Sequence, residues 1–171
     1  SYLTGIRVLE LADEQGEYAG KMLAGFGAEV LKVEPTNGNS TRAMGPFLNN
    51  EPDPDRSLYF WHYNFGKRGI ALDLSTKSGK SRFVELAKQA DLILETTPSD
   101  LSTNGFTYEA LSQVNPGLIW LRISPFGDNG PWADYKGSDL VHLALGGVMM
   151  NTGYDRDPAT KQYDTPPIAP Q

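Results

Sequence analysis

Two short stretches near the start of the chain carry side chains that could hold a nucleotide. The apolar run 6–12 leads into the turn 12–17, which reads ADEQGE, and a second apolar run, 28–34, ends on Glu34. An acid at the end of a second strand binds the ribose in many dinucleotide sites. A glycine-bearing turn before a helix is where such sites hold the pyrophosphate. The stretch therefore has the outline of a dinucleotide-binding unit.

The glycine pattern of such a unit is nevertheless absent. A dinucleotide fingerprint needs G-x-G-x-x-G directly after the first strand, but the turn here contains one glycine and three acids, Asp13, Glu14 and Glu17. Carboxylates oppose a pyrophosphate at a helix N-terminus. The phosphate-loop pattern also fails, because Leu74 occupies the position of its first glycine. The sequence therefore argues against NAD, flavin and phosphate-loop nucleotides.

Composition narrows the remaining classes of function. The 171 residues carry a formal net charge of −6 and an isoelectric point near 4.9, and the basic pair Lys67-Arg68 is short. This pair could neutralise phosphates or simply be solvated at a strand entry. An acidic chain without a basic stripe is a poor nucleic-acid binder. No run approaches the roughly 20 apolar residues of a membrane span. We expect no nucleic acid and no membrane as partners.

A metal site is not expected either. The chain has no cysteine, so neither a disulfide framework nor a thiolate metal site can form. Its two histidines, His62 and His142, are far apart and lack the spacing of metal ligands. We expect both to be structural.

Alternating strands and helices must position these side chains. Short apolar runs predict strands at 6–12, 28–34, 70–74, 91–96 and 118–124, and helical spacing predicts helices at 18–26, 75–90, 107–115 and 139–150. Strands that alternate with helices favour an α/β fold with an open, mostly parallel, Rossmann-like sheet and helices on both faces. Ligands of such sheets bind beyond the carboxyl ends of the strands. The candidate site therefore lies in the loops 12–17, 35–56, 75, 96–104 and 124–138.

The segment 57–69 is dense in aromatic residues. Phe60, Trp61, Tyr63 and Phe65 could line a pocket for an acyl group. Such a cluster more often belongs to a core or to a surface between subunits. The sequence leaves both interpretations open.

Several stretches resemble one family. "GAEVLKVEP", "KRGIALDL" and "YEALSQVNPGLIWLRISPFGDNGPWAD" are similar to the family III CoA-transferases, the group of formyl-CoA transferase, carnitine CoA-transferase and the alpha-methylacyl-CoA racemases. The likeness covers nearly the whole chain. It implies coenzyme A or acyl-CoA as substrate, a small carboxylic acid as second substrate, a cytoplasmic location and an interlocked homodimer. Family members are more than twice this length. Residues 1–150 would then be part of the Rossmann-like large domain, and 151–171 a polar, proline-rich tail leading to a downstream part.

The resemblance also carries over positions that contact CoA. These positions are Gln15, Gly16, Leu72, Asp73, Leu74, Ser75, Thr96, Thr97 and Lys136. Thr96-Thr97 stands where the family has an Asn-Phe pair, and Pro35 and Thr103 stand where it has arginines. An arginine binds phosphate through a fork of two hydrogen bonds, which neither Pro nor Thr can replace.

The catalytic residues that the resemblance implies are missing at their expected positions. The transferases use an aspartate that attacks the acyl-CoA thioester, and its position falls on Pro170, with Asp164 as the nearest substitute. The histidine of the racemases falls on Ser138. We therefore assign no catalytic residue. We expect the N-terminal portion of an enzyme that transfers CoA between an acyl-CoA and a carboxylic acid. The alternative is a catalytically silent copy that serves as a dimerisation scaffold or weak CoA-binding module.

Overall fold

The computed structural model of the chain describes residues 1–96 and 100–162. They belong to two compact units that meet at the Ser124–Pro125 boundary, and each unit is considered by itself. The predicted boundary near residue 150, with a separate tail after it, stays a prediction.

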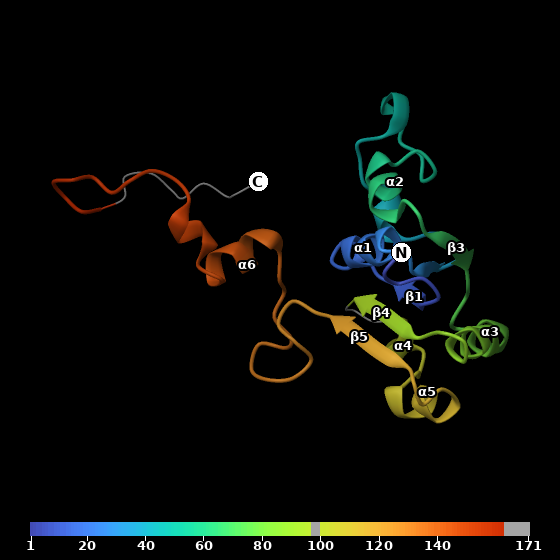
Figure 1. Cartoon of the computed structure of the whole chain (residues 1–171). Helices are drawn as coiled ribbons and strands as arrows, with labels where there is room; N and C mark the ends of the chain where they lie inside the picture. The colour runs from blue at the N-terminus through green and yellow to red at the C-terminus, as the bar shows by residue number, and fades with distance from the viewer. Residues whose placement is uncertain (97–99, 163–171) are drawn as a thin grey trace. The chain divides into compact units, whose positions relative to one another are not determined.

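The first unit is built on a five-stranded sheet with the order β3-β2-β1-β4-β5 (Figure 1). Its strands are β1 (Arg7–Leu11), β2 (Glu29–Glu34), β3 (Arg68–Ala71), β4 (Leu92–Thr96) and β5 (Ile119–Ile123). Every neighbouring pair is parallel. The predicted α/β fold with an open parallel sheet is confirmed.

Helices lie between the strands and, in the second unit, after the last strand. They are α1 (Glu17–Gly25), α2 (Leu58–Asn64), α3 (Lys77–Ala87), α4 (Asp100–Thr103), α5 (Tyr108–Val114) and α6 (Asp139–Leu145), with short 3₁₀ turns η1 (Ser40–Ala43), η2 (Leu48–Asn50) and η3 (Val148–Asn151). Hydroxyl side chains cap four of the helices by accepting a backbone N–H: Ser57 before α2, Thr76 before α3, Thr107 before α5 and Ser138 before α6.

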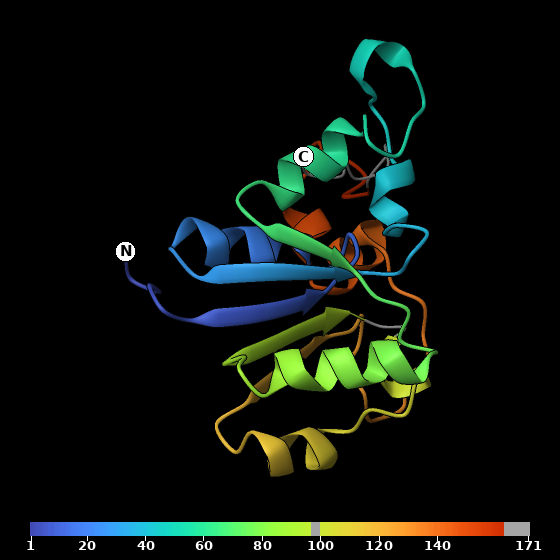
Figure 2. The ribbon, with the colours of Figure 1, turned by 90° about the vertical axis from the view of Figure 1, so that its right-hand side faces the viewer.

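Alternation along the strands divides the core between the two faces of the sheet. Leu9, Val33 and Ile93 pack with α3, α4 and α5 on one face, whereas Val8 and Val30 pack with α1 on the other. Figure 2 shows the helices on both sides of the sheet, and α2 lies beside α1. The central strands β1, β2 and β4 are thus covered on both faces, which explains their largely apolar composition. The edge strands β3 and β5 keep exposed positions, including Ile119 and Leu121.

Two predicted boundaries are wrong. The third strand covers Arg68–Ala71 rather than 70–74, because its partner β2 ends at Glu34, whose carbonyl accepts the N–H of Leu72, and the chain then turns into α3. The last helix stops at Leu145 rather than 150. Gly147 adopts a left-handed conformation with φ of 76° and terminates it.

Several large apolar side chains on α1 and α2 do not face the core. The helix predicted from Tyr18, Met22, Leu23 and Phe26 forms as α1, but only Leu23 of these four packs against the sheet core, and the other three side chains are exposed. On α2, Phe60 is buried while Trp61 is exposed.

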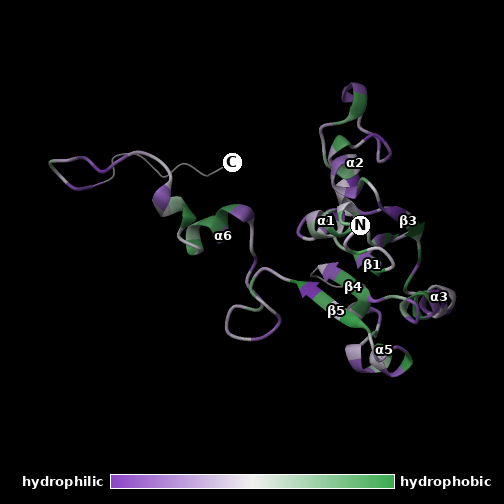
Figure 3. Ribbon diagram, viewed as in Figure 1, coloured by the Kyte–Doolittle hydropathy of each residue, from purple (hydrophilic) through white to green (hydrophobic). Residues whose placement is uncertain are grey.

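The second unit contains α6 and η3. The ring of Phe126 contacts the rings of Trp132, Tyr135 and His142. Helix α6 is apolar over much of its length (Figure 3), and Leu140 and Leu145 are exposed. Within residues 1–96 and 100–162, no helix is long and apolar enough to span a membrane.

Candidate functional site

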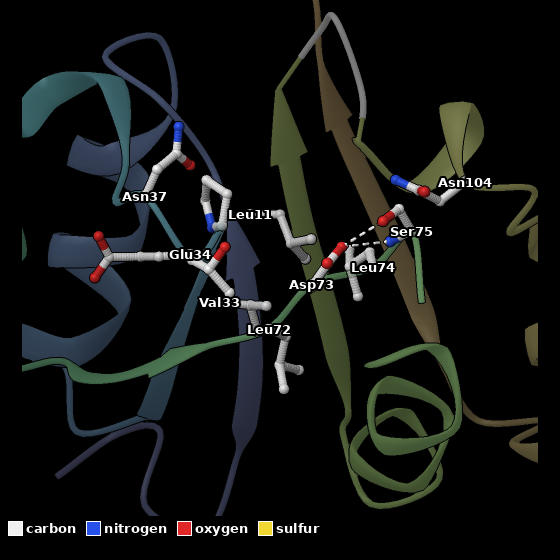
Figure 4. Close-up of a pocket in the computed structure, with 11 residues that line it drawn as sticks. Leu11, Val33, Glu34, Asn37, Leu72, Asp73, Leu74, Ser75 and Asn104 are labelled. Atoms are coloured by element: carbon white, nitrogen blue, oxygen red, sulfur yellow. Dashed lines mark hydrogen bonds between the residues drawn. The ribbon is translucent and has the colours of Figure 1, made fainter. Parts of the chain in front are cut away.

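An open cavity lies at the carboxyl ends of β1, β2 and β3 (Figure 4). Its volume is about 260 Å³. The lining residues are Leu11, Val33, Glu34, Pro35, Thr36, Asn37, Leu72, Asp73, Leu74, Ser75 and Asn104. The leucine and valine side chains provide apolar surface, and the polar residues come from the loops that follow β2, β3 and β4. The cavity is therefore where the ligand of a parallel α/β sheet is expected.

The predicted CoA positions Leu72, Asp73, Leu74 and Ser75 all line this cavity. The carboxylate of Asp73 accepts the hydroxyl of Ser75 at 2.6 Å and its backbone N–H at 3.0 Å. These hydrogen bonds lower the pKa of Asp73 below its ordinary value. The arrangement fixes the turn that starts α3, so the four residues keep one geometry at the rim.

Gly16 and Thr96 form a second group, at the ends of β1 and β4. The hydroxyl of Thr96 accepts the N–H of Asp13 at 3.0 Å. A Cβ on Gly16 would lie 2.7 Å from the methyl carbon of Thr96 and 2.9 Å from the Cβ of Ala12, so the turn needs glycine there. Gln15 is exposed beside it.

This second group lies at the point where the strand order reverses. The chain passes from β1 to β2 and β3 on one side, and then returns to β4 on the other side of β1. Ligands of open α/β sheets bind at such a switch point. The predicted CoA positions of the first unit therefore lie along one edge of the sheet, in two groups.

The remaining predicted positions lie elsewhere. Lys136 is an exposed residue of the second unit. Ser138 caps α6, since its hydroxyl accepts the N–H of Val141 at 3.4 Å. Thr97, Asp164 and Pro170 lie outside the described residues.

Glu34 does not offer its carboxylate to a ribose. Arg42 donates to it through Nε at 2.6 Å and NH2 at 2.9 Å, and the N–H of Asn39 donates at 3.1 Å. Burial alone would raise the pKa of Glu34, but the hydrogen bonds from Arg42 and Asn39 lower it below its ordinary value. Arg42 also stacks on the ring of Phe60 at 3.8 Å. The carboxylate points away from Asp73 and Ser75 (Figure 4).

The sequence pattern did not predict that four charged side chains would be buried together, namely those of Glu10, Glu17, Lys32 and Lys67. Glu10 and Lys32 face each other in the register of β1 and β2, and Lys32 Nζ lies 3.1 Å from Glu10 and 2.7 Å from Glu17. A signal for this pair was present in the sequence. Glu10 and Lys32 are charged residues within otherwise apolar strands, at positions whose side chains face α1.

Lys67 is neither solvated nor free to neutralise a phosphate. Its side chain is buried, with Nζ 2.7 Å from Glu10. Burial lowers the pKa of Lys67, against the opposing charge of Glu10. Its neighbour Arg68 is exposed and pairs with Glu29.

Metal ligands do not gather in the part of the chain that the structure describes, where no group of three or more acidic or histidine side chains could hold an ion. His62 is exposed, with Nε2 3.0 Å from the Nζ of Lys21.

Comparison with known proteins adds the family. The sequence profile of CoA-transferase family III matches residues 3–166. The succinyl-CoA:(R)-benzylsuccinate CoA-transferase subunit BbsE of Thauera aromatica is 41% identical over 159 residues, which are 92% of this chain and 39% of that protein. The formyl-CoA:oxalate CoA-transferase of Streptomyces avermitilis is 38% identical over 169 residues, 98% of this chain and 38% of that protein.

A solved structure gives the same result for the fold. A CAIB/BAIF family protein from Brucella suis superposes with a TM-score of 0.80 at 33% identity, over 96% of this chain and 42% of that chain. The chain thus spans about two-fifths of the length of the proteins that it matches.

Proposed function

The chain belongs to CoA-transferase family III, and from this premise we propose that it forms the CoA-holding, N-terminal part of an enzyme. The reaction is the transfer of CoA between an acyl-CoA and a carboxylic acid. The names of two relatives describe such a reaction: one is a subunit of a succinyl-CoA:(R)-benzylsuccinate CoA-transferase, and the other is a formyl-CoA:oxalate CoA-transferase. The chain spans about two-fifths of their length, so the activity of the whole enzyme is part of what we propose.

The observation that carries the proposal is the cavity at the carboxyl edge of the sheet. Four of the positions that the family resemblance assigns to CoA, Leu72 to Ser75, line it together. Its volume of about 260 Å³ is below the roughly 300–1,000 Å³ of pockets that enclose a whole small ligand. We therefore assign it to one end of CoA, the adenosine, whose flat ring suits the apolar floor formed by Leu11, Val33 and Leu72.

The rest of CoA would extend along the same edge. From the cavity the next predicted contacts are at the β1–α1 turn, Gln15 and Gly16, and at Thr96 on β4. A CoA molecule laid from the cavity to the switch point needs no glycine fingerprint, because its phosphates do not have to approach the N-terminus of α1. This accounts for the acids in the turn.

No nucleophile is proposed within residues 1–96 and 100–162. The family match ends at residue 166, before Pro170. Asp157 in the second unit accepts the N–H groups of Ala159 and Thr160 at 2.7 Å each, and so serves as a local turn residue.

Calorimetric titration of CoA and acetyl-CoA into the chain tests the binding proposal. We expect binding by the wild type and loss of it in Thr36→Trp, which places an indole at the cavity. Gln113→Trp puts the same ring on the exposed surface of α5 and should bind as the wild type does. No heat at millimolar CoA, or equal binding by the two variants, contradicts the assignment of the cavity.

Transfer itself needs a separate assay. The full-length protein is incubated with succinyl-CoA and oxalate, and an acyl-enzyme intermediate is trapped with hydroxylamine. CoA binding together with transfer supports the enzyme. CoA binding without transfer or trapping favours the silent module.

A homodimer in the cytoplasm completes the proposal. An interface is supported by exposed apolar side chains, because such patches mark contact surfaces. They are Tyr18 and Met22 on α1 with Phe26 directly after it, and Trp61 on α2 with Phe65 directly after it. Sedimentation equilibrium tests the dimer: a monomer at micromolar concentration contradicts it. Cell fractionation tests the location.

A further inference from the structure

The β1–α1 turn is held by buried charges on both of its sides. Glu10 and Ala12 precede the turn, and Glu17 follows it as the first residue of α1. All three contact one ammonium group, that of Lys32 on β2, whose side chain is 2% exposed. Gln15 and Gly16, two predicted CoA contacts, lie between these anchors.

The ammonium of Lys32 has three acceptors for its three N–H groups. Nζ lies 2.8 Å from the carbonyl oxygen of Ala12, 3.1 Å from Oε1 of Glu10 and 2.7 Å from Oε1 of Glu17. The Ala12 carbonyl accepts a second hydrogen bond, from the side-chain amide of Asn39 at 3.0 Å. The end of β1 is therefore fixed by the side chain of the neighbouring strand.

Lys67 completes the cluster from a third segment. Its Nζ lies 2.7 Å from Glu10, 2.9 Å from the backbone carbonyl of Glu17 and 2.9 Å from the side-chain oxygen of Asn64. The four charges of Glu10, Glu17, Lys32 and Lys67 sum to zero. The start of α1 is thus held through both its side chain and its backbone.

Stability alone is a poor reason for such a cluster. Replacing buried ion pairs by apolar residues of similar volume is often neutral or stabilising. The cluster does define one position for the end of β1 and the start of α1. We propose that Lys32 is a positioning residue for CoA, which holds the β1–α1 turn so that Gln15 and Gly16 meet the ligand at the carboxyl edge of the sheet.

The test removes Lys32 while keeping the buried charge balanced. In Lys32→Met/Glu17→Gln, Glu10 and Lys67 remain as a neutral pair. We expect a cooperative fold, a dissociation constant for CoA raised about tenfold, as for the loss of one charge-assisted hydrogen bond, and hydrogen exchange of the amides of residues 15–17 faster by a similar factor. The matched control Glu29→Gln/Arg68→Met changes an exposed pair at the opposite end of the strands, and should leave both values unchanged.

The two readouts separate this inference from the proposed function on which its ligand rests. If the wild type does not bind CoA, the proposed function fails, and exchange at the turn alone decides whether Lys32 positions it. A folded double variant with wild-type CoA affinity and wild-type exchange overturns the inference. If the double variant does not fold, Lys32→Gln/Glu17→Gln keeps the same charge balance and a polar side chain at position 32, but removes the ammonium group that binds Ala12. Exchange about threefold faster at the turn supports the inference, and unchanged exchange overturns it.

Discussion

Replacing Gly20 by alanine should destabilise the protein, although alanine is the better helix former. Gly20 lies within α1 and is buried. A Cβ at this position would lie 1.6 Å from Oε2 of Glu10 and 3.1 Å from the Nζ of Lys67. Because Glu10 is fully buried and held by Lys32 and Lys67, its carboxylate cannot move without leaving its partners.

The magnitude follows from two opposing effects. Alanine in a helix interior is favoured over glycine by about 1 kcal/mol. Breaking a buried ion pair costs about 3–5 kcal/mol. Gly20→Ala should therefore lower the free energy of unfolding by about 2–4 kcal/mol, a large fraction of the roughly 5–15 kcal/mol typical of a domain. Urea denaturation followed by circular dichroism measures the difference.

Gly25→Ala is the matched control in the same helix. Gly25 is the last residue of α1, and nothing lies within 4 Å of a Cβ placed there. This variant should be as stable as the wild type or gain up to about 1 kcal/mol. If Gly20→Ala behaves like Gly25→Ala, then Gly20 does not make room for Glu10, and the reasoning about the buried cluster fails.

Two further predictions concern the carboxyl edge of the sheet. The pKa of Glu34 is lowered in the folded protein, so its ionised form stabilises the fold above the unfolded value near 4.5, and this contribution is lost as the pH falls through the folded pKa. Urea unfolding should therefore show Glu34→Gln to be less stable than the wild type at pH 7, with a difference that shrinks below pH 4.5; an equal difference at pH 3.5 refutes the assignment. Gly16→Ala should cost about 1–3 kcal/mol by overpacking, and Thr96→Ser in the same chain should restore part of it, because it removes the methyl group 2.7 Å away and keeps the hydroxyl for Asp13. Additive effects of these two changes in thermal unfolding refute the contact.

Much of the fold could be predicted because its causes are local. The apolar runs specify buried strands by their composition alone. Hydroxyl residues before α3 and α5 supply caps within three residues of the groups that they bind. Alternation of strands and helices then favours a parallel sheet, whose carboxyl edge is the place for a ligand. Residue 75 could be placed at that edge in this way, whereas Leu72, Asp73 and Leu74 were predicted to contact CoA only through the family resemblance.

The charged contacts could not be predicted, because their partners are distant in the sequence. Arg42 reaches Glu34 from the following loop, and Lys67 reaches Glu10 across 57 positions. The sequence shows that Lys67 is charged, but it does not show whether its ammonium group faces water or a carboxylate. Burial decides between these states, since a buried charge requires an opposite charge beside it. The sequence by itself determined the five strands, the helices α1, α3, α5 and α6, and the edge of the sheet where a ligand is expected, but not α2 or α4. The tertiary structure alone decided which acids are held inside by lysines, because only the packing of β1, β2 and α1 brings Glu10, Glu17 and Lys32 together.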